Sequence, residues 1–151
     1  MIKPRYKLYV VIISLFIVVS CQQGISTATE NMHDQTLLTE VNWKLIRLND
    51  QSIDKGEGEK PLTMTLSLID NRASGYAGCN NYFGKFTLAK EQLTIGPLGM
   101  TRRFCQNSAD LEHTFTKVLS QVTHFNVTEK NLTLLDKKQT IIAEFTHKQV
   151  K

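Results

Sequence analysis

The sequence lacks the short motifs that mark the common catalytic centres. It contains no Gly-x-Ser-x-Gly turn for a serine nucleophile, no Gly-x-Gly-x-x-Gly or Walker sequence for a nucleotide, and no His-x-His or His-Glu-x-x-His spacing for zinc. The four histidines are scattered along the chain, and no acidic residues are placed as a pair for acid and base catalysis. We therefore predict that the protein is not an enzyme and holds neither a metal ion nor a cofactor.

The net charge of the chain is also small. The 151 residues include 18 Lys and Arg against 14 Asp and Glu, but Lys3, Arg5 and Lys7 all precede the first acidic residue, Glu30. Without these three, the two signs nearly cancel. Binding to phosphates needs clustered basic side chains, so the sequence predicts no nucleic-acid partner. The length and a hydrophobic content of 41% predict one compact domain rather than two, and we expect a monomer.

The N-terminal hydrophobic run is too short to cross a membrane as a helix. It extends over twelve residues, from Leu8 to Val19, whereas a spanning helix needs about 20. Basic residues precede it, and this arrangement is typical of a secretory signal peptide. We predict a signal peptide over residues 1–20.

The end of this run resembles the bacterial lipobox. Residues Val18-Val19-Ser20-Cys21 place a Cys directly after a small residue, which implies lipidation of Cys21 by a diacylglycerol and an amide-linked chain such as palmitate. Gln22 stands where Asp would mark retention in the inner membrane of enteric bacteria. The expected location is therefore the cell envelope, as an outer-membrane lipoprotein facing the periplasm if the host is Gram-negative. The alternative is an ordinary signal peptide with Cys21 incidental.

The rest of the chain divides by composition into three parts. Residues 21–37 are rich in Gln, Ser, Thr and Asn and are predicted to form a flexible tether. Residues 38–147 carry the apolar patterning of a folded domain, and residues 148–151 are a C-terminal tail.

Most of the predicted domain shows the period of strands. Apolar and polar residues alternate most clearly from Leu62 to Leu68, and similar segments occur at 41–45, 73–77, 82–88, 93–95, 124–128, 131–135 and 140–146. Residues 107–122 change to helical spacing, with Leu111, Phe115, Val118, Leu119 and Val122 on one face. One helix cannot supply the crossovers of a parallel sheet. We therefore predict an α+β domain with a mainly antiparallel, strongly curved or partly barrel-like sheet, and one principal helix that closes an opening.

The segment Gly78-Cys79-Asn80-Asn81-Tyr82-Phe83-Gly84 resembles the signature of the META domain, a family that includes HslJ-type envelope lipoproteins. Trp43 and Leu45 resemble its opening strand, and Thr101-Arg102 with Cys105 resemble a later Thr-[Lys/Arg]-x-x-Cys element. Arg103 and Phe104 depart from the usual residues. The resemblance implies a role in the bacterial envelope, since the family is associated with heat-shock and drug-resistance phenotypes.

Two kinds of site are suggested by these residues. Cys79 and Cys105 form an even pair once Cys21 is lipidated, so an exported domain is predicted to bridge them; two buried thiols or a reactive pair are the alternatives. Asn80, Asn81 and Tyr82 are candidates to line a ligand notch, although the glycines around them also suit a sharp bend of the sheet. Arg102, next to Arg103, is a candidate for anion binding or for an ordinary solvated surface.

The sequence is compatible with two functional hypotheses. The first is a non-enzymatic, membrane-anchored lipoprotein that serves stress tolerance or envelope maintenance by binding an envelope protein or ligand. The second is a piloting or chaperone-like module that holds a peptide or acyl chain of an envelope partner. The second would require an apolar cleft near the helix, for which Phe83, Phe104 and Phe115 are the candidates.

Overall fold

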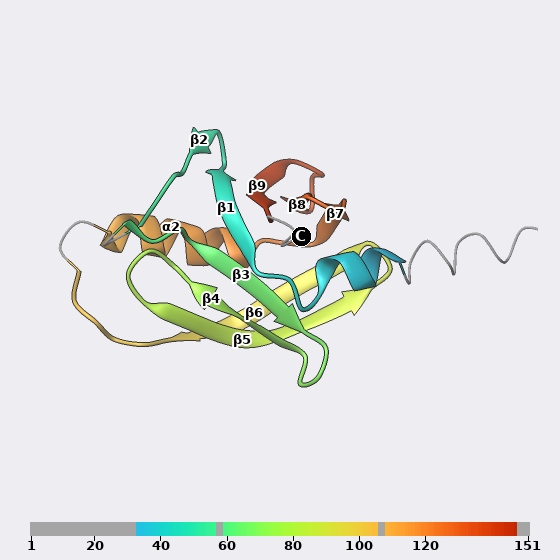
Figure 1. Cartoon of the computed structure of the whole chain (residues 1–151), viewed down its shortest axis with the longest axis horizontal. Helices are drawn as coiled ribbons and strands as arrows, with labels where there is room; N and C mark the ends of the chain where they lie inside the picture. The colour runs from blue at the N-terminus through green and yellow to red at the C-terminus, as the bar shows by residue number, and fades with distance from the viewer. Residues whose placement is uncertain (1–32, 57–58, 106–107, 148–151) are drawn as a thin grey trace, which may run out of the picture. The chain divides into compact units, whose positions relative to one another are not determined.

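The computed structural model describes residues 33–56, 59–105 and 108–147, which belong to one compact unit (Figure 1). The predicted signal peptide, Cys21, most of the predicted tether and the predicted C-terminal tail lie outside the described residues. The elements in chain order are β1 (Trp43–Leu48), β2 (Gln51–Ser52), β3 (Thr63–Ser67), β4 (Arg72–Tyr76), β5 (Asn81–Ala89), β6 (Gln92–Met100), α2 (Ala109–Leu119), β7 (His124–Val127), β8 (Asn131–Leu135) and β9 (Ile141–Thr146).

These strands form a single antiparallel sheet that closes on itself. The order is β2-β1-β3-β4-β5-β6-β7-β8-β9, and β1 pairs with β9 as well as with β3 (Figure 1). Strand β2 is attached to β1 alone, as a short hairpin outside the ring. Neighbouring strands of the ring are antiparallel. This arrangement permits short connections, whereas parallel strands would each need a long crossover connection. The predicted α+β class with a strongly curved, partly barrel-like sheet is confirmed.

The strands form where the sequence alternates, and they turn where a residue tolerates a left-handed backbone. In β3, Met64 and Leu66 are fully buried, while the alternating residues Thr63, Thr65 and Ser67 are partly exposed. Asn71, between β3 and β4, has φ of 50°, and Lys90, between β5 and β6, has φ of 56°. Both positions fall in the turns expected from the sequence, and Asn is among the residues that adopt this conformation most readily.

Helix α2 covers the core of the ring with the predicted apolar face. Phe115, Val118 and Leu119 are buried on this helix, and the Phe115 ring packs edge-on against Tyr82 at 5.8 Å between centroids. It also lies 6.3 Å from the ring of Phe145 on β9. The interior is therefore filled by side chains from the helix and from strands on both sides of the ring.

Residues 33–38 are helical, although the sequence predicted a flexible tether up to residue 37. The tether prediction is wrong for residues 33–37. Leu38 is fully buried, and its carbonyl oxygen accepts a hydrogen bond of 2.9 Å from Trp43 Nε1. This contact depends on the folded strand β1, so the composition of the segment alone gave no sign of it.

Candidate functional site

The family-like segment forms the end of β4, a tight turn and the start of β5. Gly75 pairs with Tyr82, and Tyr76 with Asn81. An added Cβ at Gly75 would lie 2.0 Å from the backbone oxygen of Thr63, so only glycine allows β3 and β4 to approach this closely. Gly78 has φ of +109° in the turn. The glycines thus bend the sheet and admit a neighbouring strand, one of the two roles expected for them.

Cys79 and Cys105 are joined by a disulfide, as predicted. Their Cα atoms lie 6.1 Å apart and the two residues are separated by 26 positions. The bridge ties the turn between β4 and β5 to the segment that precedes α2. In this structure neither sulfur is a free thiol.

Asn80 is buried at the centre of a hydrogen-bond network and is not placed to bind a ligand. Its side-chain oxygen accepts hydrogen bonds from Thr101 Oγ1 (2.9 Å) and from the backbone NH of Arg103 (2.7 Å). Its side-chain nitrogen donates to the Arg103 carbonyl (3.1 Å) and to Glu112 Oε1 (3.2 Å). The backbone NH of Asn80 donates to Glu112 Oε2 at 2.6 Å. Asn80 therefore fastens this turn to α2, and the prediction that it lines a ligand notch is wrong.

We expect Asn80→Ala to lower the free energy of unfolding by roughly 2 kcal/mol, because the substitution removes the hydrogen bonds of a buried amide that joins the turn to Thr101, Arg103 and Glu112. Urea unfolding of the full chain measures the change. The matched control is Asn81→Ala: Asn81 is exposed, so its loss should change stability by no more than about 0.5 kcal/mol. Equal effects of the two substitutions would contradict the structural role of Asn80.

Tyr82 also has a structural role. Its side chain is 1% exposed, and its hydroxyl donates a hydrogen bond of 3.0 Å to the Thr63 carbonyl. Burial raises the pKa of Tyr82 well above its usual value, so the hydroxyl remains a proton donor. Tyr82 also borders the hollow described next, so its expected place beside a notch stays a prediction while its hydroxyl serves the fold.

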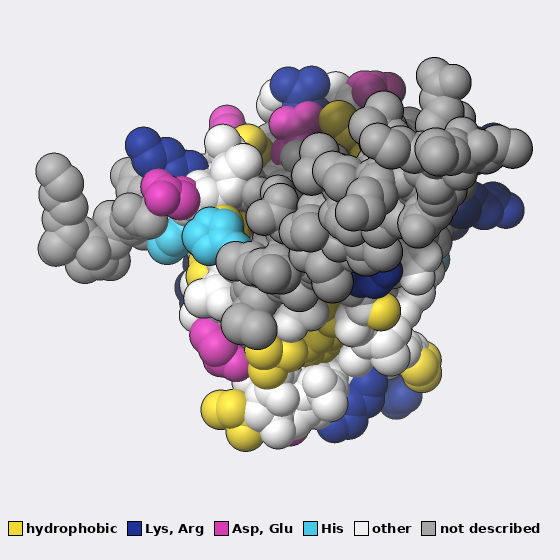
Figure 2. All heavy atoms as spheres, turned by 90° about the vertical axis from the view of Figure 1, so that its right-hand side faces the viewer, with side chains coloured by type: hydrophobic (Ala, Val, Ile, Leu, Met, Phe, Trp, Pro, Cys, Tyr) yellow, Lys and Arg dark blue, Asp and Glu magenta, His cyan; other side chains and the backbone are white. Residues whose placement is uncertain are grey.

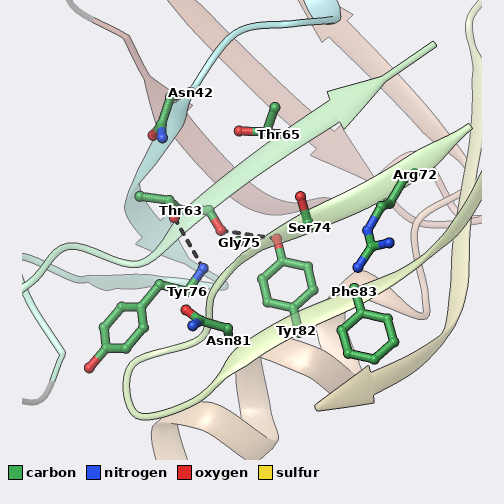
Figure 3. A pocket seen from close by; sticks show the side chains of 10 residues that line it. All are labelled: Asn42, Thr63, Thr65, Arg72, Ser74, Gly75, Tyr76, Asn81, Tyr82 and Phe83. Atoms are coloured by element: carbon green, nitrogen blue, oxygen red, sulfur yellow. Dashed lines mark hydrogen bonds between the residues drawn. The ribbon is translucent and has the colours of Figure 1, made fainter. Parts of the chain in front are cut away.

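A shallow hollow of about 420 Å³ lies on the outer face of β3, β4 and β5, opposite the core (Figure 3). Tyr76 lies at one side of it, and Arg72 and Phe83 lie at the other (Figure 3). The Arg72 Cζ atom is 4.9 Å from the centroid of the Phe83 ring. Between the two sides are small polar residues and Asn81, the exposed candidate from the sequence. The floor residues are Thr63, Thr65 and Ser74.

Two further hollows adjoin this one and share its lining residues. One, of about 310 Å³, shares Tyr76 and Asn81 and adds Lys60 and Arg103. The other, of about 240 Å³, shares Arg72 and Phe83 and adds Lys85. We call the three together the outer tract. Arg102 is exposed, but its neighbour Arg103 is the arginine that lines this surface.

Sequence reasoning missed Arg72, Lys85 and Lys60 as site residues. A signal was present, because outward positions of β4 and β5 alternate with the buried ones and can be assigned from the period-2 pattern. What the sequence could not give was the register that places Arg72 on β4 opposite Lys85 on β5.

The three phenylalanines proposed for an apolar cleft do not form one. Phe115 is fully buried in the core, Phe83 is 45% exposed on the outer face, and Phe104 is 90% exposed. Phe83 follows Tyr82 on the same strand, so the two side chains point to opposite faces of the sheet. The expectation of an acyl-chain cleft at these residues is wrong, because inward positions are occupied by the packed core.

The face drawn in Figure 2 carries charged side chains of both signs. Apolar side chains gather at the lower edge of the face drawn in Figure 2, while basic side chains occur in separate groups around it, with acidic ones among those at the top. Among the described residues, no three His, Cys, Asp or Glu side chains are grouped to hold a metal ion. No helix in the described ranges is long and apolar enough to span a membrane.

Comparison with known proteins gives the family. The META domain model matches residues 36–149. The chain belongs to the META domain family. It is 28% identical over 117 residues to heat shock protein HslJ of Escherichia coli (strain K12), with 76% of each chain covered. The resemblance stated from the Gly78–Gly84 segment is thereby confirmed.

Solved structures share the fold. An NMR structure of a protein from Burkholderia xenovorans superposes with a TM-score of 0.62 at 23% identity, covering 78% of this chain and 88% of the other. A crystal structure of a DUF4847 family protein from Bacteroides vulgatus ATCC 8482 has a TM-score of 0.54 at 11% identity, covering 78% of this chain and 99% of the other. At these identities the likeness extends to the fold alone.

Proposed function

We propose that this META-domain protein is a non-enzymatic lipoprotein of the bacterial envelope that serves stress tolerance or envelope maintenance by binding a partner. Similarity to a protein named for heat shock supports the stress role. The lipobox-like sequence ending at Cys21 supports a membrane anchor, placed in the outer membrane and facing the periplasm if the host has one. The domain acts as a monomer at the end of its tether.

The observation that supports binding rather than catalysis is that the family-like segment has two kinds of residue, some that hold the fold and some that remain exposed. Its chemically distinctive side chains are used to hold the fold: Cys79 in the disulfide, Asn80 in the buried network and Tyr82 in the core. The side chains of the segment that remain exposed, Asn81 and Phe83, lie on the outer face of the barrel. Side chains presented from strands suit recognition of a partner.

Replacing Cys21 by Ser is expected to abolish lipidation and to move the full chain from the membrane fraction to the soluble fraction. Loss of both lipid chains removes the anchoring energy, which scales with the number of buried methylene groups. Fractionation with a high-salt wash measures the distribution. Ser20→Ala keeps a small residue before the Cys and should leave the protein in the membrane fraction. Cys21→Ser protein that stays in the washed membranes would contradict the lipid anchor at Cys21.

A further inference from the structure

The outer tract carries positive charge without a counter-charge. Four cations line it, namely Lys60, Arg72, Lys85 and Arg103, and all four are exposed. None of the residues that line its three hollows is acidic. The ion pairs in the described part of the chain lie elsewhere, between Arg47 and Glu144 and between Lys55 and Glu59.

Two of these cations face each other across neighbouring strands. Arg72 on β4 pairs directly with Lys85 on β5. Like charges in this position destabilise a sheet, whereas opposite charges stabilise it. A surface selected only for stability would place an acidic residue at one of the two positions.

Neutral groups hold three of the four cations in place without cancelling their charge. Arg72 lies over the Phe83 ring, and Lys85 Nζ donates to the Asp70 carbonyl at 2.6 Å. Arg103 Nη2 donates to the Cys79 carbonyl at 2.8 Å. The side chains are thus positioned in advance, which lowers the entropy lost when an anion binds.

From this charge and geometry we propose that the outer tract binds an acidic segment of a partner protein in an extended conformation. The inference rests on the proposed function, in that it names the surface and the chemistry through which the domain binds. The pair Tyr76 and Asn81 is separated from the pair Arg72 and Lys85 by four residues along β5, or about 14 Å of strand. An extended segment of four or five residues has this length. Its carboxylates meet the cations at the two ends, and its polar backbone lies over the hydroxyl groups of the floor.

The surface suits a peptide better than a sugar chain or a lipid headgroup layer. Sugar rings commonly stack on an open aromatic face, but Arg72 covers the Phe83 ring, which also rests against Gly99: an added Cβ there would lie 3.0 Å from ring carbons. Anionic bilayers attract clustered basic segments that lie along the membrane surface. Here the cations border concave hollows, which an extended chain can fill.

The test is binding of a fluorescently labelled peptide of alternating Glu and Gly to the full chain in nonionic detergent, followed by fluorescence anisotropy. The same peptide with Gln in place of Glu is the uncharged reference. Arg72→Gln combined with Lys60→Gln is expected to raise the dissociation constant about tenfold. The matched control is Lys137→Gln combined with Lys138→Gln, which removes the same amount of charge from the turn between β8 and β9, outside the tract. This control should change the dissociation constant less than about twofold.

Several results would overturn the proposal. These are equal affinity for the Glu and Gln peptides, equal losses in the two double variants, or stronger displacement of the labelled Glu peptide by glycerol phosphate or oligogalacturonate than by the unlabelled Glu peptide. The experiment is independent of lipidation. If Cys21→Ser shows no change in location, the proposed envelope anchor fails while peptide binding can still be measured. If the peptide does not bind, the anchored lipoprotein stands and this surface assignment fails.

Discussion

Phe115→Ala is expected to lower the free energy of unfolding by about 4 kcal/mol. The side chain is fully buried between α2 and the barrel, where it contacts the rings of Tyr82 and Phe145. Its removal loses the transfer free energy of the ring and leaves a cavity where the helix closes the sheet. Chemical unfolding followed by circular dichroism measures the change.

Phe104→Ala is the matched control for this substitution. Phe104 is 90% exposed, so the same deletion there should alter the free energy of unfolding by no more than about 0.5 kcal/mol. Comparison of the two substitutions distinguishes a phenylalanine in the core from one on the surface. A stable Phe115→Ala protein would mean that Phe115 lines an accessible cleft, as the chaperone-like alternative required, and would contradict the packed interior.

Removal of the disulfide is expected to have an effect of similar size. A loop of 26 residues closed by Cys79 and Cys105 restricts the unfolded chain by about 3.5 kcal/mol on the loop-entropy relation. The double substitution Cys79→Ala and Cys105→Ala should therefore lower the melting temperature by roughly 15 °C. Calorimetry of the two proteins measures the shift.

A reducing agent provides an independent control for the disulfide. It should lower the melting temperature of the wild type towards that of the double variant and leave the variant unchanged. A wild type with the same melting temperature in oxidising and reducing buffer would show that the bridge is absent or does not stabilise the fold.

The sequence was most informative where local pattern decides structure. The alternation in β3 and the apolar face of α2 could be predicted because both depend on residues near one another in the chain. The turns at Asn71 and Lys90 lie between predicted strand segments, 62–68 and 73–77 in one case and 82–88 and 93–95 in the other. Strand β2 was missed because its two residues, Gln51 and Ser52, are both exposed and leave no apolar pattern.

The candidate site was harder to predict because its roles depend on contacts between distant residues. Asn80 meets Arg103 and Glu112, which lie 23 and 32 residues away. A polar residue in a glycine-rich turn has the same local pattern whether it faces solvent or is buried. For this reason Asn80 was expected to line a ligand notch, whereas its side chain is buried in a hydrogen-bond network.

The recognisable segment serves both the fold and the outer tract, since its residues Asn81 and Phe83 line that surface. Cys79, Asn80 and Tyr82 belong to the recognisable segment, and each holds the fold. Arg72 and Lys85 lie on the adjoining outer surface and are outside that short segment. Differences in partner among proteins with this fold are therefore expected to arise from the outward positions of β4 and β5.

Intact-mass measurement of the protein extracted from membranes, with thiols alkylated before and after reduction, tests the central claim most directly. The account predicts a chain that begins at Cys21, carries a diacylglyceryl group and an amide-linked acyl chain, and takes up alkylating reagent at Cys79 and Cys105 only after reduction. An unlipidated chain with both cysteines alkylated before reduction would contradict the anchored, disulfide-bridged envelope protein proposed here.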